Sequence, residues 1–144
     1  MKFIVNGESK EFNVDTLIVA GWTGRNQEAV QEHIDELAEL GVAPPSTVPL
    51  FYKVSQQMLT QQKQIQVLSE GTSGEIEPIV VHADGEFWFG IASDHTDRDL
   101  EAFSVAHSKQ VCPKPVCNEL WPLSDIEDHL EPVSYTHLTL PTIA

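Results

Sequence analysis

The clearest periodic pattern of apolar residues in the chain follows Asn26. Apolar side chains recur there three or four positions apart, at Val30, Ile34, Leu37 and Ala38. This spacing places them on one stripe of an α-helix, with polar residues around the rest of its surface. Asn26 is a favourable N-cap, and Gly41 is typical of a helix end. The pattern therefore predicts a helix over about residues 26–40 that packs through one face.

Shorter apolar runs bounded by turn residues predict β-strands along most of the remaining chain. Asn6-Gly7 and Asp84-Gly85 each favour the positive φ angles of a tight turn, so each predicts a β-hairpin. The predicted strands are residues 2–5, 10–14, 17–20, 48–54, 65–68, 75–81 and 87–92. The glutamine-rich segment 55–64 is compatible with a short helix or a loop.

A second helix is predicted over about residues 96–107. Thr96 followed three positions later by Asp99 has the pattern of a capping box, and Leu100 and Phe103 would lie on the buried side. Residues 121–130 form a last short segment with a partly helical pattern. Few helices among many strands indicate an α+β fold without internal repeats.

Composition and charge narrow the class of protein. The chain has 144 residues, 41% of them apolar, which suffices for one globular domain with a core. Its formal net charge of −14 and the lack of a basic stripe argue against nucleic acid or an anionic membrane as a partner. No apolar run approaches the ~20 residues of a membrane span, and the amino terminus lacks the layout of a signal peptide. We therefore expect a cytoplasmic location.

The carboxyl-terminal residues need separate treatment. The sequence of residues 133–142 resembles the translation of a sequencing adapter, so we expect residues 133–144 to be a non-native tail. Residues 1–132 are then a single truncated domain. On this interpretation the natural protein is longer, and we expect that full-length parent to form a homodimer. The alternative is a genuine β-prone tail.

Three carboxylates suggest a metal site. Glu75 and Glu77 lie two positions apart in a predicted strand, so their side chains point to the same face. Neighbouring carboxylates repel each other, and a hard cation such as Mg²⁺ or Mn²⁺ would supply the missing positive charge. The hairpin after Glu77 brings the chain back, so Asp94 can complete the set. The alternative is an edge strand with solvated glutamates.

These motifs carry a resemblance to a known family. The chain has a Glu-x-Glu motif, then a hairpin, then the segment Asp94-His95-Thr96-Asp97-Arg98-Asp99-Leu100-Glu101. Together they resemble the metal-site signature of the fumarylacetoacetate hydrolase family, whose usual sequence pattern after the hairpin is close to D-x-[ST]-x-R-D-x-Q. More closely, residues 17–115 resemble a divergent bacterial branch of that family whose function is unknown. The resemblance implies a mixed β-roll or β-sandwich, incomplete at its carboxyl end, with the first helix packed outside.

The resemblance also implies a catalytic pair. The family carries a G-R-N … H-x-x-E element, which is similar to Gly24-Arg25-Asn26 followed by His33 and Glu36. Here the gap between the two halves is longer than usual, and Gln27 replaces the family's tyrosine. In the family such a pair positions water or moves a proton over the metal-bound substrate. The alternative is an ordinary solvent-facing His–Glu pair on a helix.

Further site residues are implied in the same way. Residues 49–53 are similar to the family's P-x-x-F-x-K strand, which makes Tyr52 and Lys53 candidates for substrate contact. Arg98 stands at the family's arginine position and suits bidentate capture of a carboxylate. Glu101 replaces the family's glutamine near the substrate. Lys109 resembles the family's lysine, which would stabilise negative charge on an oxyanion, although its spacing from the acidic motif is shorter here. Core packing and surface ion pairs are the alternatives.

A zinc site is a weaker interpretation of other residues. Cys112 and Cys117 could be combined with His95, His107 and His129. Their spacing is wider than the usual Cys-x2-Cys, two prolines intervene, and no second pair follows. The cysteines also do not form the framework of a disulfide-rich secreted protein.

The sequence thus leads to one functional hypothesis and two alternatives. We expect a divalent-metal-dependent hydrolase or carbon–carbon lyase that acts on a small oxo-acid or dicarbonyl substrate. In it, Glu75, Glu77 and Asp94 would hold Mg²⁺ or Mn²⁺, which polarises substrate oxygens. An isomerase or decarboxylase of the same fold is one alternative. A non-catalytic metal-binding or scaffold protein is the other.

Overall fold

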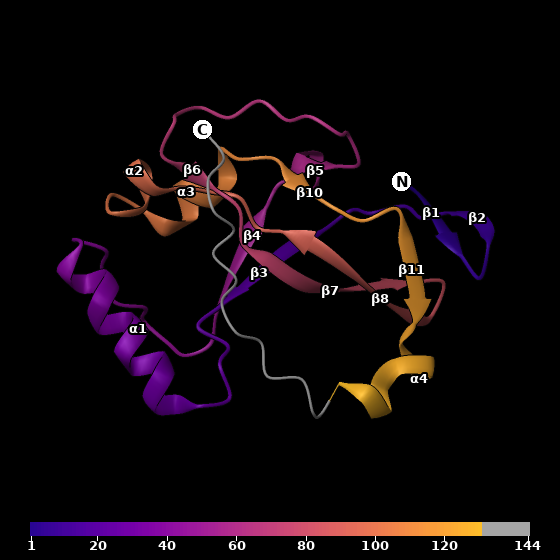
Figure 1. Ribbon diagram of the computed structural model, residues 1–144, viewed down its shortest axis with the longest axis horizontal. Coiled ribbons are helices and arrows are strands. Elements are labelled where there is room, and N and C mark those ends of the chain that lie inside the picture. Colours follow the sequence, from indigo (N-terminus) through magenta and orange to yellow (C-terminus); the bar gives the residue numbers. More distant parts are fainter. Residues whose placement is uncertain (131–144) are drawn as a thin grey trace.

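A five-stranded mixed β-sheet is the largest unit of the fold in the computed structural model, which describes residues 1–130 (Figure 1). Its strands lie in the order β2-β1-β11-β8-β7. They are β1 (Lys2–Val5), β2 (Glu8–Glu11), β7 (Ile76–Ala83), β8 (Glu86–Ser93) and β11 (Glu119–Pro122). β1 and β11 are parallel, whereas the other neighbours are antiparallel, so the sheet is mixed.

Three two-stranded ladders accompany this sheet. β3 (Leu17–Gly21) pairs with β4 (Leu50–Val54) and β6 (Thr72–Ser73) with β9 (Thr96–Asp97), both antiparallel. β5 (Leu59–Thr60) pairs with β10 (Lys114–Pro115) in parallel. The β6–β9 ladder holds the segment before β7 against the segment after β8, which sets up the candidate site.

Helices are few and short, so the fold is α+β. The α-helices are α1 (Gln27–Glu39), α2 (Arg98–Glu101), α3 (Val105–Gln110) and α4 (Leu123–Ile126). Two 3₁₀ turns are η1 (Gln56–Met58) and η2 (Glu127–His129). Within residues 1–130, none of these helices has both the length and the apolar character needed to cross a membrane.

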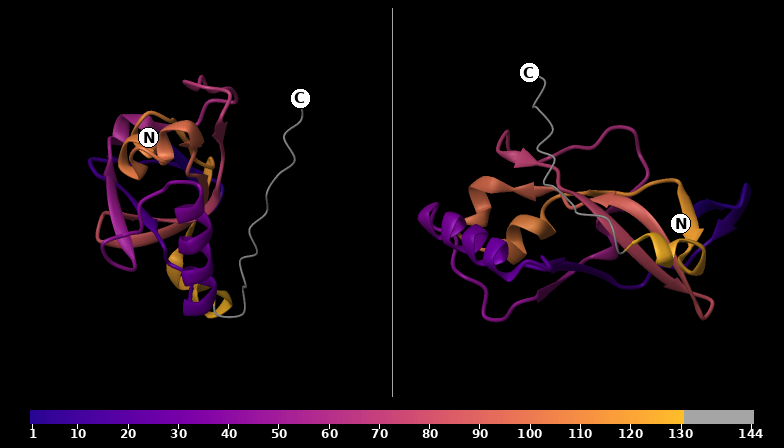
Figure 2. Two further views of the ribbon diagram at one scale, coloured as in Figure 1. Left: turned by 90° about the vertical axis from the view of Figure 1, so that its left-hand side faces the viewer. Right: turned by 60° about the horizontal axis from the view of Figure 1, so that its bottom comes forward.

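The predicted first helix is confirmed as α1. The Asn26 side chain accepts hydrogen bonds from the backbone N–H groups of Glu28 at 3.0 Å and Ala29 at 3.3 Å, which makes it the N-cap. Val30 and Ile34 of the apolar stripe are buried. The helix lies to one side of the five-stranded sheet, as two views show (Figures 1 and 2).

The core lies on one face of the five-stranded sheet. Phe12 is at its centre, with ring centroids 5.7 Å from Phe3 and 5.6 Å from Trp88. Leu120 of the central strand β11 is fully buried beside them. Side chains alternate along β7 and β8, so Ile79 and Val81 pack on this core while the residues between them face outward.

Several sequence predictions hold for individual elements. Both hairpin turns and the strand at residues 17–20 are confirmed, although β2 ends earlier than predicted and β4 begins at Leu50. Residues 65–68 were predicted as a strand, which is wrong, because they form no ladder with any described segment. In the segment 121–130, the first two residues end β11, and α4 and η2 follow, so the partly helical prediction is confirmed. The predicted tail, residues 133–144, lies outside the described residues.

The predicted helix over 96–107 is wrong in form. Thr96 and Asp97 belong to β9, and two short helices, α2 and α3, follow instead of one. The Asp97 side chain caps α2 by accepting from the Leu100 N–H at 3.1 Å. Thr96 instead donates to the Asp94 carbonyl at 3.2 Å. The helix breaks because Ser104, in an extended conformation, starts a second cap by accepting from the His107 N–H.

Candidate functional site

The predicted carboxylates lie where β7 begins and β8 ends. The Asp94 N–H donates to the Glu75 carbonyl at 2.8 Å, which continues the antiparallel ladder one pair beyond Ile76 and Ser93. Residues directly opposite in such a ladder share a face of the sheet. Glu75, Glu77 and Asp94 therefore all face the side that carries the core, at its charged end. This arrangement follows the predicted geometry of the hairpin.

A buried lysine joins two of these carboxylates. The Lys109 ammonium donates to Asp94 Oδ2 at 2.5 Å and lies 3.7 Å from Glu75 Oε2. It also donates to the Thr96 hydroxyl at 3.3 Å. The side chains of Lys109 and Asp94 are each only 7% exposed. The structure therefore brings together three residues that the sequence assigned separately to metal binding and catalysis.

A second buried lysine, Lys114, also contacts Asp94, although it was not among the site residues predicted from the sequence. Its ammonium lies 3.0 Å from Asp94 Oδ1 and donates to the His95 carbonyl. Each oxygen of Asp94 thus faces a different ammonium. A signal for Lys114 did exist, because Cys112, Lys114 and Val116 alternate along an extended segment and all three are buried. A lysine in phase with buried apolar residues indicates an internal partner.

Arg98 closes the other side of the cluster from the start of α2. Its three guanidinium nitrogens reach separate acceptors, namely Glu75 Oε1 at 2.7 Å, Glu101 Oε2 at 3.0 Å and Ser73 Oγ at 2.7 Å. Glu101 is buried, which explains why it requires a charged partner. Both oxygens of Glu75 consequently lie near protein cations, Arg98 on one side and Lys109 on the other.

The cluster is balanced in charge. Three carboxylates, of Glu75, Asp94 and Glu101, meet three cations, of Arg98, Lys109 and Lys114. Burial alone would lower the pKa of Lys109, but the nearby Asp94 and Glu75 charges outweigh it and raise that pKa. The pKa of Lys114 is lowered, because burial dominates over its attraction to Asp94.

Two of the predicted metal ligands converge, and a protein cation lies between them. Glu75 and Asp94 point carboxylate oxygens at one positive centre, the Lys109 ammonium, and such oxygens are the ligands that Mg²⁺ prefers. Glu77 lies on the same face but is exposed, opposite Ala92. Among residues 1–130, no three His, Cys, Asp or Glu side chains are gathered closely enough to hold a metal ion together. Two of the three predicted ligands therefore converge.

The other predicted residues form a separate group around Trp22. The rings of Trp22 and His33 lie 5.6 Å apart, and the Trp22 indole N–H donates to the Tyr52 hydroxyl at 3.4 Å. Glu36 is exposed and lies 3.8 Å from His33, one helical turn away. Lys53 is exposed on β4. His33, Glu36 and Tyr52 are thus linked to one another through Trp22, on elements other than those that carry the charged cluster.

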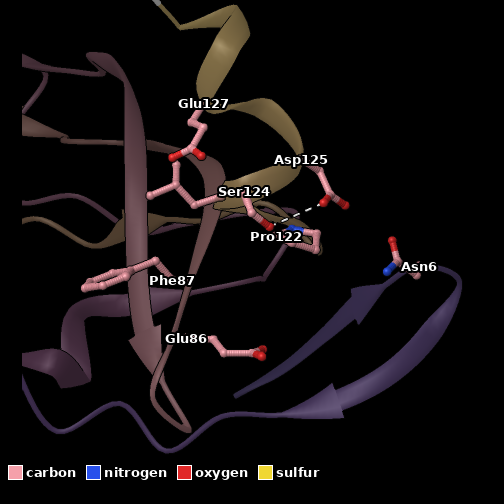
Figure 3. A pocket seen from close by; sticks show the side chains of 8 residues that line it. Asn6, Glu86, Phe87, Pro122, Ser124, Asp125 and Glu127 are labelled. Atoms are coloured by element: carbon pink, nitrogen blue, oxygen red, sulfur yellow. Dashed lines mark hydrogen bonds between the residues drawn. The ribbon is translucent and has the colours of Figure 1, made fainter.

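Two surface pockets lie elsewhere in the described chain. One, of about 530 Å³, lies between the β1–β2 turn, the start of β8 and α4 (Figure 3). Glu86, Asp125 and Glu127 are among the residues that line it. The other, of about 990 Å³, is lined by residues of the segment 57–66, four of them glutamines, and by Pro113. Neither of these two pockets is lined by a predicted site residue.

Replacing Arg98 with lysine tests the three-way contact. One ammonium cannot reach Glu75, Glu101 and Ser73 together, so we expect R98K to lower the free energy of unfolding by about 2 kcal/mol. Urea denaturation at neutral pH measures the change. R25K, at an exposed arginine, is the matched control and should change stability by about 0.5 kcal/mol or less. Equal losses in the two variants would contradict the assigned role of Arg98.

Comparisons with known proteins identify a family. The sequence model of a family described as "protein of unknown function (DUF2848)" matches residues 20–140. This range contains every residue of the charged cluster. No curated protein and no solved structure matches the chain.

Proposed function

Because the chain belongs to the DUF2848 family, whose description assigns no activity, we propose a function from the site itself: a divalent-metal-dependent hydrolase or carbon–carbon lyase that acts on a small oxo-acid or dicarbonyl substrate. The observation that carries the proposal is the convergence of Glu75 and Asp94 on one cation. Glu75 lies just before β7 and Asp94 just after β8, and burying the two together is costly unless a positive charge is held between them.

Glu75 and Asp94 would hold Mg²⁺ or Mn²⁺, with Glu77 as the third carboxylate from the same face. The bound ion supplies Lewis-acid polarisation of the substrate's oxygens. A substrate carboxylate needs cationic partners, and Arg98 and Lys109 provide both a planar fork and an ammonium beside the two ligands. Glu101 fixes the Arg98 fork in place through its 3.0 Å contact.

The group around Trp22 would serve the substrate side of the reaction. His33 with Glu36 would position water or move a proton, as the resemblance to the fumarylacetoacetate hydrolase family implies. Tyr52 and Lys53 would contact the substrate from β4. The same resemblance supports a β-roll or β-sandwich of that family's type. We extend the proposal to a homodimer and to a cytoplasmic location.

Two alternatives use the same residues. An isomerase or decarboxylase would also need a polarised oxo-acid, so the cluster supports it equally well. The other alternative is a non-catalytic metal-binding or scaffold protein, and its scaffold form is favoured by one observation, namely that the oxygens of Glu75 and Asp94 already lie near protein cations. Turnover of an oxo-acid that depends on both metal and His33 would separate the enzyme from this alternative.

Thermal melting with added metal tests the proposed site. A ligand that binds only the folded state raises its stability, so Mg²⁺ or Mn²⁺ about a hundredfold above its Kd should raise Tm by about 5–10 °C. The double variant E75A/E77A should lose this rise. The control E32A/E39A removes two exposed glutamates from α1 and should retain it. A folded wild-type chain whose Tm does not respond to either metal would refute the metal site.

A further inference from the structure

We propose that two copies of this chain associate through the outward face of the five-stranded sheet, the face opposite the core. This face is formed by Ile4 of β1, Trp121 of β11 and every second residue of β7 and β8. The outward residues of β7 and β8 are Ile76, Pro78, Val80, His82, Phe87, Phe89, Ile91 and Ser93. The inference rests on the proposed homodimer, to which it assigns a surface, and not on the metal site.

Large apolar side chains lie open to solvent on the outward face. Six of them, on four neighbouring strands, are each 38–57% exposed, namely Ile4, Ile76, Val80, Phe87, Ile91 and Trp121. Phe89 lies directly opposite Val80 on one side and Trp121 on the other, so the three form one row across β7, β8 and β11. Single exposed apolar residues are normal on a protein surface, whereas a contiguous patch marks an interface.

The distribution of charge favours a second copy as the occupant. None of the eight outward residues of β7 and β8 is charged, although 21% of the whole chain is. The charged residues within these strands, Glu77 and Glu86, alternate with them and point to the other face. A net charge of −14 opposes self-association, so two copies meet with least repulsion through a face that lacks carboxylates. A basic partner would find no acidic groups at these eight positions.

The area of the patch suits a stable dimer. A large aromatic side chain buries about 150–250 Å², so six apolar residues that are about half exposed, with Pro78, His82 and Phe89 beside them, present on the order of 700 Å². The largest apolar patch on a typical monomer is about 300–600 Å². A stable interface buries about 800 Å² on each partner. The outward face therefore approaches the size of a dimer interface.

The two ends of the outward face are complementary under a twofold axis. Aromatic rings gather at the hairpin end, where His82 and Phe87 stack with ring centroids 4.7 Å apart. The other end carries the smaller Ile76, Pro78 and Ser93. A twofold axis across the strands lays the bulky end of one copy on the smaller end of the other, with the two sheets packed as in a β-sandwich. Because the patch then contacts itself, the assembly closes as a dimer.

Analytical ultracentrifugation of wild type, V80E, F87E and F51E tests this surface. Wild type should sediment as a dimer at about 10 µM. V80E and F87E each place two carboxylates in an apolar interface, so each should raise the dimer Kd about a hundredfold or more. F51E is the matched control, because Phe51 is 63% exposed on β4, outside the outward face, and this variant should keep the Kd within about threefold of wild type. Circular dichroism checks that each variant is folded.

The outcomes separate this surface from the proposed homodimer and from the metal site. A dimer that survives both V80E and F87E overturns the outward face and leaves the homodimer standing. Loss of the dimer in F51E alone moves the interface to β3 and β4. A wild-type chain that remains monomeric at about 100 µM overturns the surface and the homodimer together, and a different molecule or further chain then covers the face. Melting with added metal tests the metal site independently of all these results.

A second measurement needs no substitution. Hydroxyl-radical oxidation, read by mass spectrometry, reports the access of solvent to each aromatic ring. Trp121 is 41% exposed in the single chain, so its oxidation should fall about fivefold when the protein concentration rises from below to above the dimer Kd. Phe103, 81% exposed and outside the outward face, should be oxidised equally at both concentrations. Unchanged oxidation of Trp121 in the dimer would overturn the proposed surface.

Discussion

Replacing Asp94 with asparagine should lower the free energy of unfolding by about 3–5 kcal/mol. The neutral side chain leaves Lys114 without its carboxylate partner and Lys109 with only the more distant Glu75, at 3.7 Å. Both ammonium groups remain buried, and an unpaired buried charge is among the largest single sources of instability. Urea denaturation at neutral pH measures the loss.

Two further variants show where the Asp94 effect comes from. D15N removes an exposed aspartate and should change stability by about 0.5 kcal/mol or less. The double variant D94N/K114M also removes one of the two unpaired ammonium groups. Its loss in free energy of unfolding should therefore be smaller than the sum of the losses in the two single variants. If D94N alone costs about 1 kcal/mol or less, Asp94 does not hold the two lysines as described.

Replacing Phe12 with alanine should be comparably damaging, at about 3–5 kcal/mol. Phe12 is 1% exposed and lies between the rings of Phe3 and Trp88, so its removal opens a cavity at the centre of the core. Its backbone N–H and carbonyl both pair with Met1, which holds the start of the chain against the segment after β2. Urea denaturation again provides the measurement.

Phe51 offers a matched control for Phe12. Both are phenylalanines in or next to short strands, but Phe51 is 63% exposed on β4. F51A should therefore change stability by about 0.5 kcal/mol or less. Similar losses for F12A and F51A would mean that the assigned core does not stabilise the fold.

The elements predicted most accurately are those whose conformation is determined by residues within the element itself. Asn26 caps α1 through its own side chain, and Asn6-Gly7 and Asp84-Gly85 adopt the positive φ angles that their turns require. The helix predicted over 96–107 was wrong because Ser104 has an equally local role as a cap, which interrupts it. Residues 65–68 were wrongly assigned because an apolar run without a pairing partner does not make a strand.

Part of the candidate site could also be predicted from the sequence, because hairpin geometry determines which residues lie opposite each other. The hairpin fixes which residues of β7 and β8 face each other, so the meeting of Glu75 with Asp94 follows from turn geometry. Lys114 could not be assigned from residue type, because lysines are usually exposed. The position of His33 relative to the cluster depends on how α1 packs, and no local pattern encodes that packing.

The position of β11 in the sheet has a consequence for the synthesis of the protein. β11 lies between β1 and β8, and it pairs in parallel with a strand more than a hundred positions earlier in the chain. Until residues 119–122 leave the ribosome, β1 and β8 each present an open edge that another chain can join. The sheet therefore closes late, through contacts that are distant in sequence and slow to form. A chaperone that covers these two edges would act on the growing chain, because in the finished fold β11 already occupies both.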